Sequence, residues 1–296
     1  MGNIKRENIE IQLLLDAIFQ KYGYDFRSYS RAHVKRRILR RLAMTDLETV
    51  SDMIKEVLYH PDFFDKLLLD LSINVTEMFR DPSFYMTVRK EIIPVLRTYP
   101  FLKIWHAGCS TGEEIYSLAI LLQEEGLYGR VQIYATDFNE VVLEKAKEGI
   151  YPIDFIKDYT VNYQQAGGTR SFSDYYSAHY DYVIMKKALR ERVVFADHNL
   201  VTDGVFGEMN MIICRNVLIY FNQELQGNVH KLFLESLCPG GFLCLGSKES
   251  LRFSKYYDSF TAVLEKEKIY RKKYGDIIAP LKKQPVPETQ GPISKI

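Results

Sequence analysis

The sequence predicts an α/β fold, in which a mostly parallel sheet is covered by helices on both faces and follows an all-helical domain. Two observations support this prediction. Residues 1–90 carry apolar residues only at helical spacing, and from Leu102 onward apolar segments, turns and helices alternate. Alternating strands and helices form parallel sheets, because each strand returns to the sheet through a helix that packs on one face.

The amino-terminal domain is expected to cover residues 1–90 and to contain helices. Apolar residues recur at helical spacing, which places them on one face of each helix, in IQLLLDAIFQKYG, RAHVKRRILRRLAM, LETVSDMIKEVLYH and FFDKLLLDLSI.

The α/β domain is expected to cover residues 91–274. Its strands are predicted in FLKIWHAG, VQIYATD, MNMIICRN and, as the last strand, FLCLGS. The helices between them are predicted in EEIYSLAILLQEEG, NEVVLEKAKEG and QELQGNVHKLFLESLCPGG. Ligands of parallel sheets bind beyond the carboxyl ends of the strands, so the site is expected in the turns that follow the strands.

Two segments depart from the alternation of strand and helix. Residues of about 150–192 are rich in Tyr and show strand-like alternation in DYVIMKK and ERVVFAD, which we interpret as a small inserted β element. Residues 275–296 contain four prolines and few apolar residues, a composition that predicts a disordered tail.

Composition excludes several classes of protein. The net charge is +1 at pH 7, which argues against a wholly basic nucleic-acid binder. There is no apolar stretch of roughly 18 residues and no signal-peptide pattern, so a cytoplasmic protein without membrane insertion is expected. The four cysteines lack CxxC spacing, so we expect buried thiols, no disulfides and no metal.

The turn GCSTG (108–112) shows what the site could bind. It matches neither GxGxxG nor GxxxxGK[ST], and the two acids that follow, Glu113 and Glu114, would repel a phosphate. S-adenosylmethionine fits better, because Gly108 permits close approach of the backbone and a carboxylate neutralises a cationic ligand. The alternative is that both acids only complement the helix dipole.

Asp137 ends the next predicted strand. An acid at this position of a doubly wound sheet can accept both ribose hydroxyls of an adenosine. Its alternative role is to cap the following helix. Acids after two consecutive strands together favour a nucleoside ligand, and a dehydrogenase would require the phosphate turn that is missing here.

Longer motifs point to a family. SINVTEMFRD (72–81), HAGCSTGEEIYSLAI (106–120) and IICRNVLIYF (212–221), with ATDFNEVVLEKAKEGIY between the last two, resemble the CheR-type chemoreceptor glutamate methyltransferases. The resemblance covers residues 10–270. It implies a class I S-adenosylmethionine-dependent methyltransferase fold, Rossmann-like, with an all-α domain and a small antiparallel β insertion.

The resemblance also implies an activity and a site. The family transfers the methyl group of S-adenosylmethionine to glutamate carboxylates on the cytoplasmic helices of chemoreceptors. Arg80 and Tyr220 would lie near the methyl group as catalytic residues. The cofactor would be bound by Asn74, Thr76, Arg80, Glu114, Asp137, Asn199, Leu200, Arg215 and Asn216. Taken singly, Arg80 could be a surface cation, Tyr220 a core aromatic residue and Asn199 a turn residue.

The expected chemistry requires no general base, because a glutamate side chain with a pKa near 4.3 is already ionised at neutral pH. The site would have to align nucleophile, methyl and sulfur and exclude water. The run CRNV (214–217) also differs from the Asn/Asp-Pro-Pro-Tyr turn of amino-methylating enzymes, which counts against a nucleobase substrate.

The segment RAHVKRRILRRLAM is the predicted docking surface for the receptor. It carries an apolar stripe and, largely around the rest of the helix, the cations Arg31, Lys35, Arg37, Arg40 and Arg41. A Glu-rich receptor helix is the favoured partner; nucleic acid or a purely solvated face are the alternatives. We expect a monomer. Alternative functions are a cofactor-binding sensor or scaffold without turnover, and a methyltransferase for another protein carboxylate.

Overall fold

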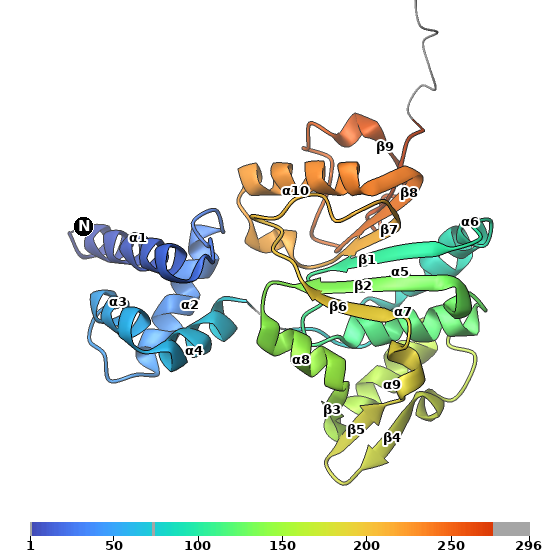
Figure 1. Ribbon diagram of the computed structural model, residues 1–296, viewed down its shortest axis with the longest axis horizontal. Coiled ribbons are helices and arrows are strands. Elements are labelled where there is room, and N and C mark those ends of the chain that lie inside the picture. The colour runs from blue at the N-terminus through green and yellow to red at the C-terminus, as the bar shows by residue number, and fades with distance from the viewer. Residues whose placement is uncertain (1, 73–74, 275–296) are drawn as a thin grey trace, which may run out of the picture.

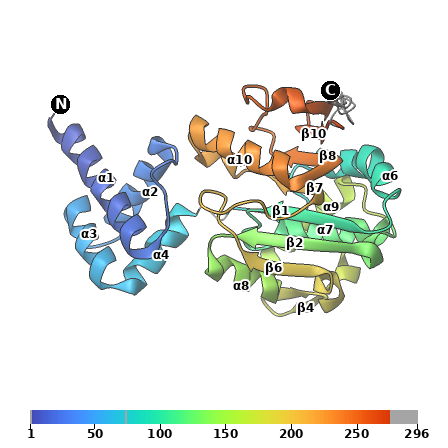
Figure 2. The same cartoon turned by 45° about the horizontal axis from the view of Figure 1, so that its top comes forward.

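The computed structural model describes residues 2–72 and 75–274 and consists of a helical domain beside an α/β domain (Figure 1). Figure 2 shows the same separation after rotation, with the helical domain at one end of the sheet domain. The predictions for Asn74 and for a disordered tail over 275–296 fall outside the described residues. No helix within the described ranges is long and apolar enough to cross a bilayer.

The helical domain forms from the four predicted segments: α1 (Gly2–Tyr22), α2 (Arg31–Ala43), α3 (Val50–Tyr59) and α4 (Pro61–Leu71). Local sequence explains where two of them begin. Thr49 and Asp52 form a capping box at the start of α3, and Pro61 occupies the first turn of α4. The apolar faces meet in a core that contains Leu14, Ile18 and Met53, all fully buried.

The core of the helical domain ends near residue 72, before the expected boundary at residue 90. Its buried members run from Ile11 to Leu71, whereas residues from Met78 onward belong to the core of the sheet domain. The elements that follow are α5 (Pro82–Thr87), the π-helical turn η1 (Val88–Ile92) and α6 (Ile93–Leu96). They join the sheet domain because their apolar side chains are buried in its core.

The main sheet confirms the predicted mostly parallel α/β fold. Its strand order is β6 (Val193–Asp197), β2 (Val131–Asp137), β1 (Leu102–Ala107), β7 (Met209–Cys214), β8 (Leu237–Leu245), β10 (Ile269–Lys272) and β9 (Phe260–Leu264). The first five strands of this order are parallel, and β10 runs antiparallel to both β8 and β9.

Two strand assignments differ from the sequence prediction. ERVVFAD, expected in the insertion, forms β6 and pairs with β2 at the edge of the main sheet. FLCLGS is not the last strand, because β9 and β10 follow it and extend the sheet. Strand periodicity identified ERVVFAD as extended, but the partner of a strand depends on contacts that periodicity does not contain.

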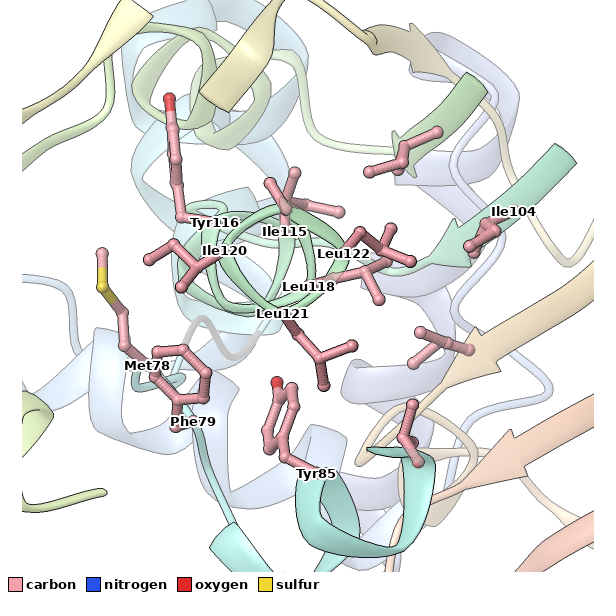
Figure 3. Packing of buried hydrophobic residues seen from close by; sticks show 14 of the residues in the cluster. Met78, Phe79, Tyr85, Ile104, Ile115, Tyr116, Leu118, Ile120, Leu121 and Leu122 are labelled. Atoms are coloured by element: carbon pink, nitrogen blue, oxygen red, sulfur yellow. The ribbon is translucent and has the colours of Figure 1, made fainter. Parts of the chain in front are cut away.

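Alternate residues of the central strands enter two cores, one on each face of the sheet. Ile104 of β1 faces α7 (Glu113–Glu124), and the adjacent Trp105 faces α10 (Gln223–Ser236). Helices α8 (Glu140–Glu148) and α9 (Ile156–Gln165) contribute to the α7 side. In Figure 3, Leu118 and Leu122 of α7 point toward β1, while Leu121 points toward Tyr85 of α5. Helix α7 is therefore buried on several sides.

The small insertion is antiparallel, as the resemblance implied, with strand order β3 (Ile150–Pro152), β5 (Tyr182–Met185) and β4 (Tyr176–His179). Short 3-10 helices complete the described structure: η2 (Tyr128–Arg130), η3 (Ile153–Phe155), η4 (Phe172–Tyr175), η5 (Lys187–Arg190), η6 (Leu218–Tyr220) and η7 (Tyr257–Ser259).

Candidate functional site

A cavity that is open to solvent at its mouth lies beyond the carboxyl ends of β1, β2 and β7. Residues of the helical domain and of the linker to it, including Tyr29 and Leu71, form part of its wall. The structure brings together here all the described residues that were predicted to bind cofactor or act in catalysis: Thr76, Arg80, Gly108, Glu114, Asp137, Asn199, Leu200, Arg215, Asn216 and Tyr220.

The turn after β1 depends on glycine for close approach to another loop. Gly108 has a φ of +78°, and a Cβ added to it would lie 2.5 Å from Cγ2 of Val217, in the loop after β7. The amides of Gly108 and Cys109 both donate to the carbonyl of Thr136, at 2.8 and 2.9 Å. The turn therefore packs directly against the end of β2 and the loop that follows β7.

The two acids that open α7 have different environments. Glu113 accepts a hydrogen bond from Oγ1 of Thr111 at 2.7 Å. Glu114 lines the cavity, pairs with Arg215, and lies 3.5 Å from Nε2 of His106. Burial opposes its ionisation, but Arg215 and His106 outweigh burial and lower the pKa of Glu114 to about 2. The carboxylate is therefore charged at neutral pH and already compensated within the protein.

Asp137 lines the cavity at the end of β2. Its Oδ2 accepts from the amide of Ser110 at 2.9 Å and its Oδ1 from the amide of Asn139 at 3.1 Å. Burial raises the pKa of Asp137 to about 6, although these backbone hydrogen bonds act in the other direction. The capping role is filled by Asn139, whose side chain accepts from the amide of Val141 at the start of α8.

The segment that carries Arg80 is held by Arg215. Phe79 and Asp81, on either side of Arg80, have φ values of 53° and 54°, in the left-handed region that non-glycine residues rarely adopt. Arg215 donates to the carbonyl of Arg80 at 3.1 Å and to Oδ2 of Asp81 at 2.6 Å. Its guanidinium also lies over the ring of Phe84. Arg215 thus connects Glu114 to the Arg80 segment.

Tyr220 lies where the two domains meet. Its carbonyl accepts from the amide of Ser30 at 2.7 Å, and its ring meets that of His33 edge to face at 5.4 Å. Burial raises the pKa of Tyr220, against the opposing effect of the nearby Arg80 and Arg37. The phenol is therefore protonated at neutral pH and can donate a hydrogen bond.

Sequence comparisons identify the family. The family model described as "CheR methyltransferase, all-alpha domain" matches residues 9–72, and the model described as "CheR methyltransferase, SAM binding domain" matches residues 74–268. The chain belongs to the CheR methyltransferase family. These matches meet at residues 72–74, where the helical core ends.

Individual relatives agree with this assignment. A Pseudomonas putida protein with the name "Putative methyltransferase Cher3" is 53% identical over 272 residues, which are 92% of this chain and 100% of the relative. The chemotaxis protein methyltransferase of Escherichia coli is 31% identical, covering 82% of this chain and 84% of its own. The chemotaxis protein methyltransferase of Listeria innocua is 30% identical, and the match covers 77% of this chain and 85% of the relative.

The cavity fits the cofactor that the family domain binds, S-adenosylmethionine. Each carboxylate oxygen of Asp137 has a lone pair beyond the one used by a backbone amide, which suits two adjacent hydroxyls. Two lining residues carry buried polar atoms, Nδ1 of His198 and Oδ1 of Asn216, that have no hydrogen-bond partner among the described residues. A ligand with several polar groups could satisfy them.

Several lining residues were not singled out from the sequence, among them Tyr29, Phe138 and His198. Tyr29 precedes α2 and meets Phe221 edge to face at 4.9 Å. His198 lies directly before the predicted Asn199, and this position next to a predicted residue was the one sequence feature that could have identified His198 as a lining residue. Tyr29 has no local signal, because its place in the wall results from the packing of two domains.

The cations predicted for docking differ in their surroundings. Arg31 and Arg40 are exposed on α2. Lys35 pairs with Glu7, and Arg41 pairs with Asp70, so these two cations also stabilise the helical domain. Arg37 is half-buried and, as noted, close enough to Tyr220 to influence its pKa. The predicted set therefore includes two exposed cations, two that pair with acids of the same domain, and one that lies close to Tyr220.

Among the residues that the structure describes, no group of three or more His, Cys, Asp or Glu could hold a metal ion. The thiols of Cys109, Cys214 and Cys244 are buried, and Cys238 is half-buried.

Proposed function

We propose that this protein transfers the methyl group of S-adenosylmethionine to glutamate side chains on the cytoplasmic helices of chemoreceptors, forming glutamate methyl esters. The observation that carries the proposal is that groups of both charges meet at the cavity. Glu114 lines it at the start of α7 and Asp137 at the end of β2, and Arg80 lines it close enough to Glu114 and Tyr220 to influence the pKa of each. A cationic cofactor and an anionic substrate together match these two kinds of charge.

On the cofactor side, the proposed ligand-binding residues are those that line the cavity around Asp137 and Glu114, together with Asn74. When bound, S-adenosylmethionine supplies an electrophilic methyl group next to a sulfonium. Asp137 would accept hydrogen bonds from ribose hydroxyls, and Glu114 would offset positive charge. Asn199 and Leu200 would lie beside the adenine, with Thr76, Gly108, Arg215 and Asn216 completing the walls.

On the substrate side, the protein has to orient a carboxylate that is already ionised. Arg80 suits this role because a guanidinium can hold a carboxylate through two parallel hydrogen bonds. Tyr220, whose phenol keeps its proton at neutral pH, can donate a further hydrogen bond and exclude water from the reacting atoms. Alignment of this kind contributes several kcal/mol without an acid/base pair.

The helical domain is the proposed docking surface. Arg31 and Arg40 are exposed on the same helix whose residue His33 contacts Tyr220. A Glu-rich receptor helix bound along α2 would therefore bring its carboxylates close to the mouth of the cavity. The names of the Escherichia coli and Listeria relatives, chemotaxis protein methyltransferases, support a partner of this kind. A cytoplasmic, monomeric enzyme is part of the proposal.

The test is a methyl-transfer assay with methyl-labelled S-adenosylmethionine and a purified receptor cytoplasmic fragment. We expect label on the receptor that alkali releases as methanol, because esters hydrolyse in base whereas methylated amines do not. A receptor fragment with its acceptor glutamates replaced by alanine is the control. Tight binding of S-adenosylhomocysteine without any methyl transfer would instead support a sensor or scaffold. Methyl transfer only to another protein would identify that protein, and not the receptor, as the substrate.

A further inference from the structure

Glu249 is a buried acid outside the predicted site. It follows β8 and is only 5% exposed. Within the described residues its hydrogen-bond partners are backbone amides rather than cations. A buried carboxylate that has no cation needs several well-aligned donors, so its position is strongly constrained.

The two carboxylate oxygens of Glu249 contact different parts of the loop after β7. Oε2 accepts from the amide of Gly246 at 2.6 Å and from the amide of Asn216 at 3.1 Å. Oε1 accepts from the amide of Ile219 at 3.3 Å. A single side chain thus fixes the loop just after Arg215 and again just before Tyr220.

We propose that Glu249 is a positioning residue that holds the 215–220 loop in the conformation required for cofactor binding through Asn216 and for methyl transfer through Tyr220. Asn216 has a φ of 61°, in the left-handed region that asparagine tolerates better than most residues but that contacts with its surroundings still help to hold. The hydrogen bond from its amide to Glu249 is one such restraint. The inference rests on the proposed function for the part that concerns Tyr220.

Gly246 supports the same conclusion independently. A Cβ added to Gly246 would lie 2.8 Å from the amide nitrogen of Asn216 and 2.8 Å from Oε2 of Glu249. The loops after β7 and β8 therefore approach each other at a point where only glycine leaves room for the carboxylate and its donors.

Two substitutions distinguish the contributions of the two carboxylate oxygens of Glu249. Glu249→Gln keeps one carbonyl oxygen for Gly246 and Asn216, but turns an NH₂ group toward the amide of Ile219, so only the contact next to Tyr220 is lost. Glu249→Ala removes both contacts. Gly246→Ala disturbs the same junction without removing the acid and serves as a second variant if Glu249→Ala does not fold. Lys248→Gln, at an exposed position in the same loop, is the control.

The experiment combines calorimetric titration with S-adenosylhomocysteine, thermal unfolding, and kcat and KM for methyl transfer to a receptor fragment. For Glu249→Gln we expect one binding site per chain, an affinity within about 3-fold of wild type, and a kcat lower by about 10- to 100-fold. For Glu249→Ala, or for Gly246→Ala if it replaces that variant, we expect the affinity to fall by about 10-fold as well. Lys248→Gln should match wild type in every measurement.

Two results would overturn the inference. One is an unchanged kcat in Glu249→Gln; the other is a lower kcat fully explained by a smaller fraction of chains that bind the ligand, which would indicate loss of folded protein only. If wild type binds S-adenosylhomocysteine but transfers no methyl group, the proposed function fails. The calorimetry of Glu249→Ala or Gly246→Ala then decides the cofactor-binding part, since an unchanged affinity contradicts it.

Discussion

The arginines of the cavity and those of α2 carry the same charge in opposite environments. The side chain of Arg215 is 1% exposed and contacts Glu114, Asp81 and the carbonyl of Arg80. Arg31 and Arg40 project into solvent from α2. A buried arginine is held in one position because its partners must compensate its desolvation, whereas an exposed arginine remains mobile and hydrated.

This difference separates two uses of charge in one protein. The buried cluster determines the relative positions of three segments: the start of α7, the Arg80 segment and the loop after β7. The exposed cations can attract an acidic partner over a distance that depends on ionic strength. Substitutions in the first group should affect folding and the cofactor site, and substitutions in the second should affect only the encounter with the receptor.

The largest effect is expected from Arg215→Met. Loss of one partner from a buried ion pair costs about 3–5 kcal/mol, because Glu114 would remain buried without its main counter-charge. Denaturant unfolding should show this loss, and calorimetry should show lost binding of S-adenosylhomocysteine. Arg31→Met, the exposed control, should change stability by no more than about 0.5 kcal/mol. Equal effects of the two substitutions would contradict the comparison.

The next largest effect is expected from substitutions of Arg80 and Tyr220, the two residues proposed to act on the substrate carboxylate. Arg80→Ala should lower kcat by about 100-fold, because it removes the donor that orients the substrate carboxylate. Tyr220→Phe should lower kcat by about 10-fold while leaving the affinity for S-adenosylhomocysteine within about 2-fold. Steady-state methyl-transfer assays measure kcat, and calorimetry measures the affinity for S-adenosylhomocysteine. A Tyr220→Phe variant with wild-type kcat would remove Tyr220 from the proposed mechanism.

A pH-dependent effect is expected at Asp137. Its pKa of about 6 in the free protein is raised by burial, and ribose hydroxyls bind the ionised form better. Bound ligand should therefore lower this pKa, so the affinity for S-adenosylhomocysteine should rise by about 10-fold from about pH 5 to about pH 7. Asp137→Asn should bind more weakly and show little of this rise. A rise of equal size in the variant would assign the titration to another group.

The smallest effect is expected on α2. Replacing both Arg31 and Arg40 by glutamate should raise KM for the receptor by about 3- to 10-fold at low salt, with kcat and cofactor affinity unchanged. The difference should shrink as salt rises, because exposed charges are screened. The control places two glutamates at the exposed Lys231, on α10, and Lys266, in the turn between β9 and β10, which changes net charge equally but on other elements. Equal effects on KM would point to net charge rather than docking.

Much of the fold could be predicted because it depends on local periodicity. The four amino-terminal helices and the strands β1, β2 and β7 occur where apolar spacing indicated them. The prediction was wrong where pairing decided the result: ERVVFAD joined the main sheet, and β9 and β10 extended it beyond FLCLGS. A strand pattern specifies an extended segment but not its neighbour.

For the candidate site, the sequence indicated which turns carry polar residues but left their alternatives open. The structure assigned the capping role to Asn139 rather than Asp137. It also showed that Glu114 is compensated by Arg215. Glu249 and Tyr29 escaped notice, because an acid surrounded by backbone amides and a tyrosine at a domain junction have no pattern of their own.

The sequence by itself determined the helical and strand segments, the turns at which a ligand could bind, and the family. These depend on residues that are neighbours along the chain or form continuous motifs. Only the tertiary structure decided how the charges are paired. Glu114 and Arg215 are 101 positions apart in the sequence, and Glu249 and Asn216 are 33 positions apart. Such contacts arise when the sheet brings the carboxyl ends of its strands together, so no local pattern contains them.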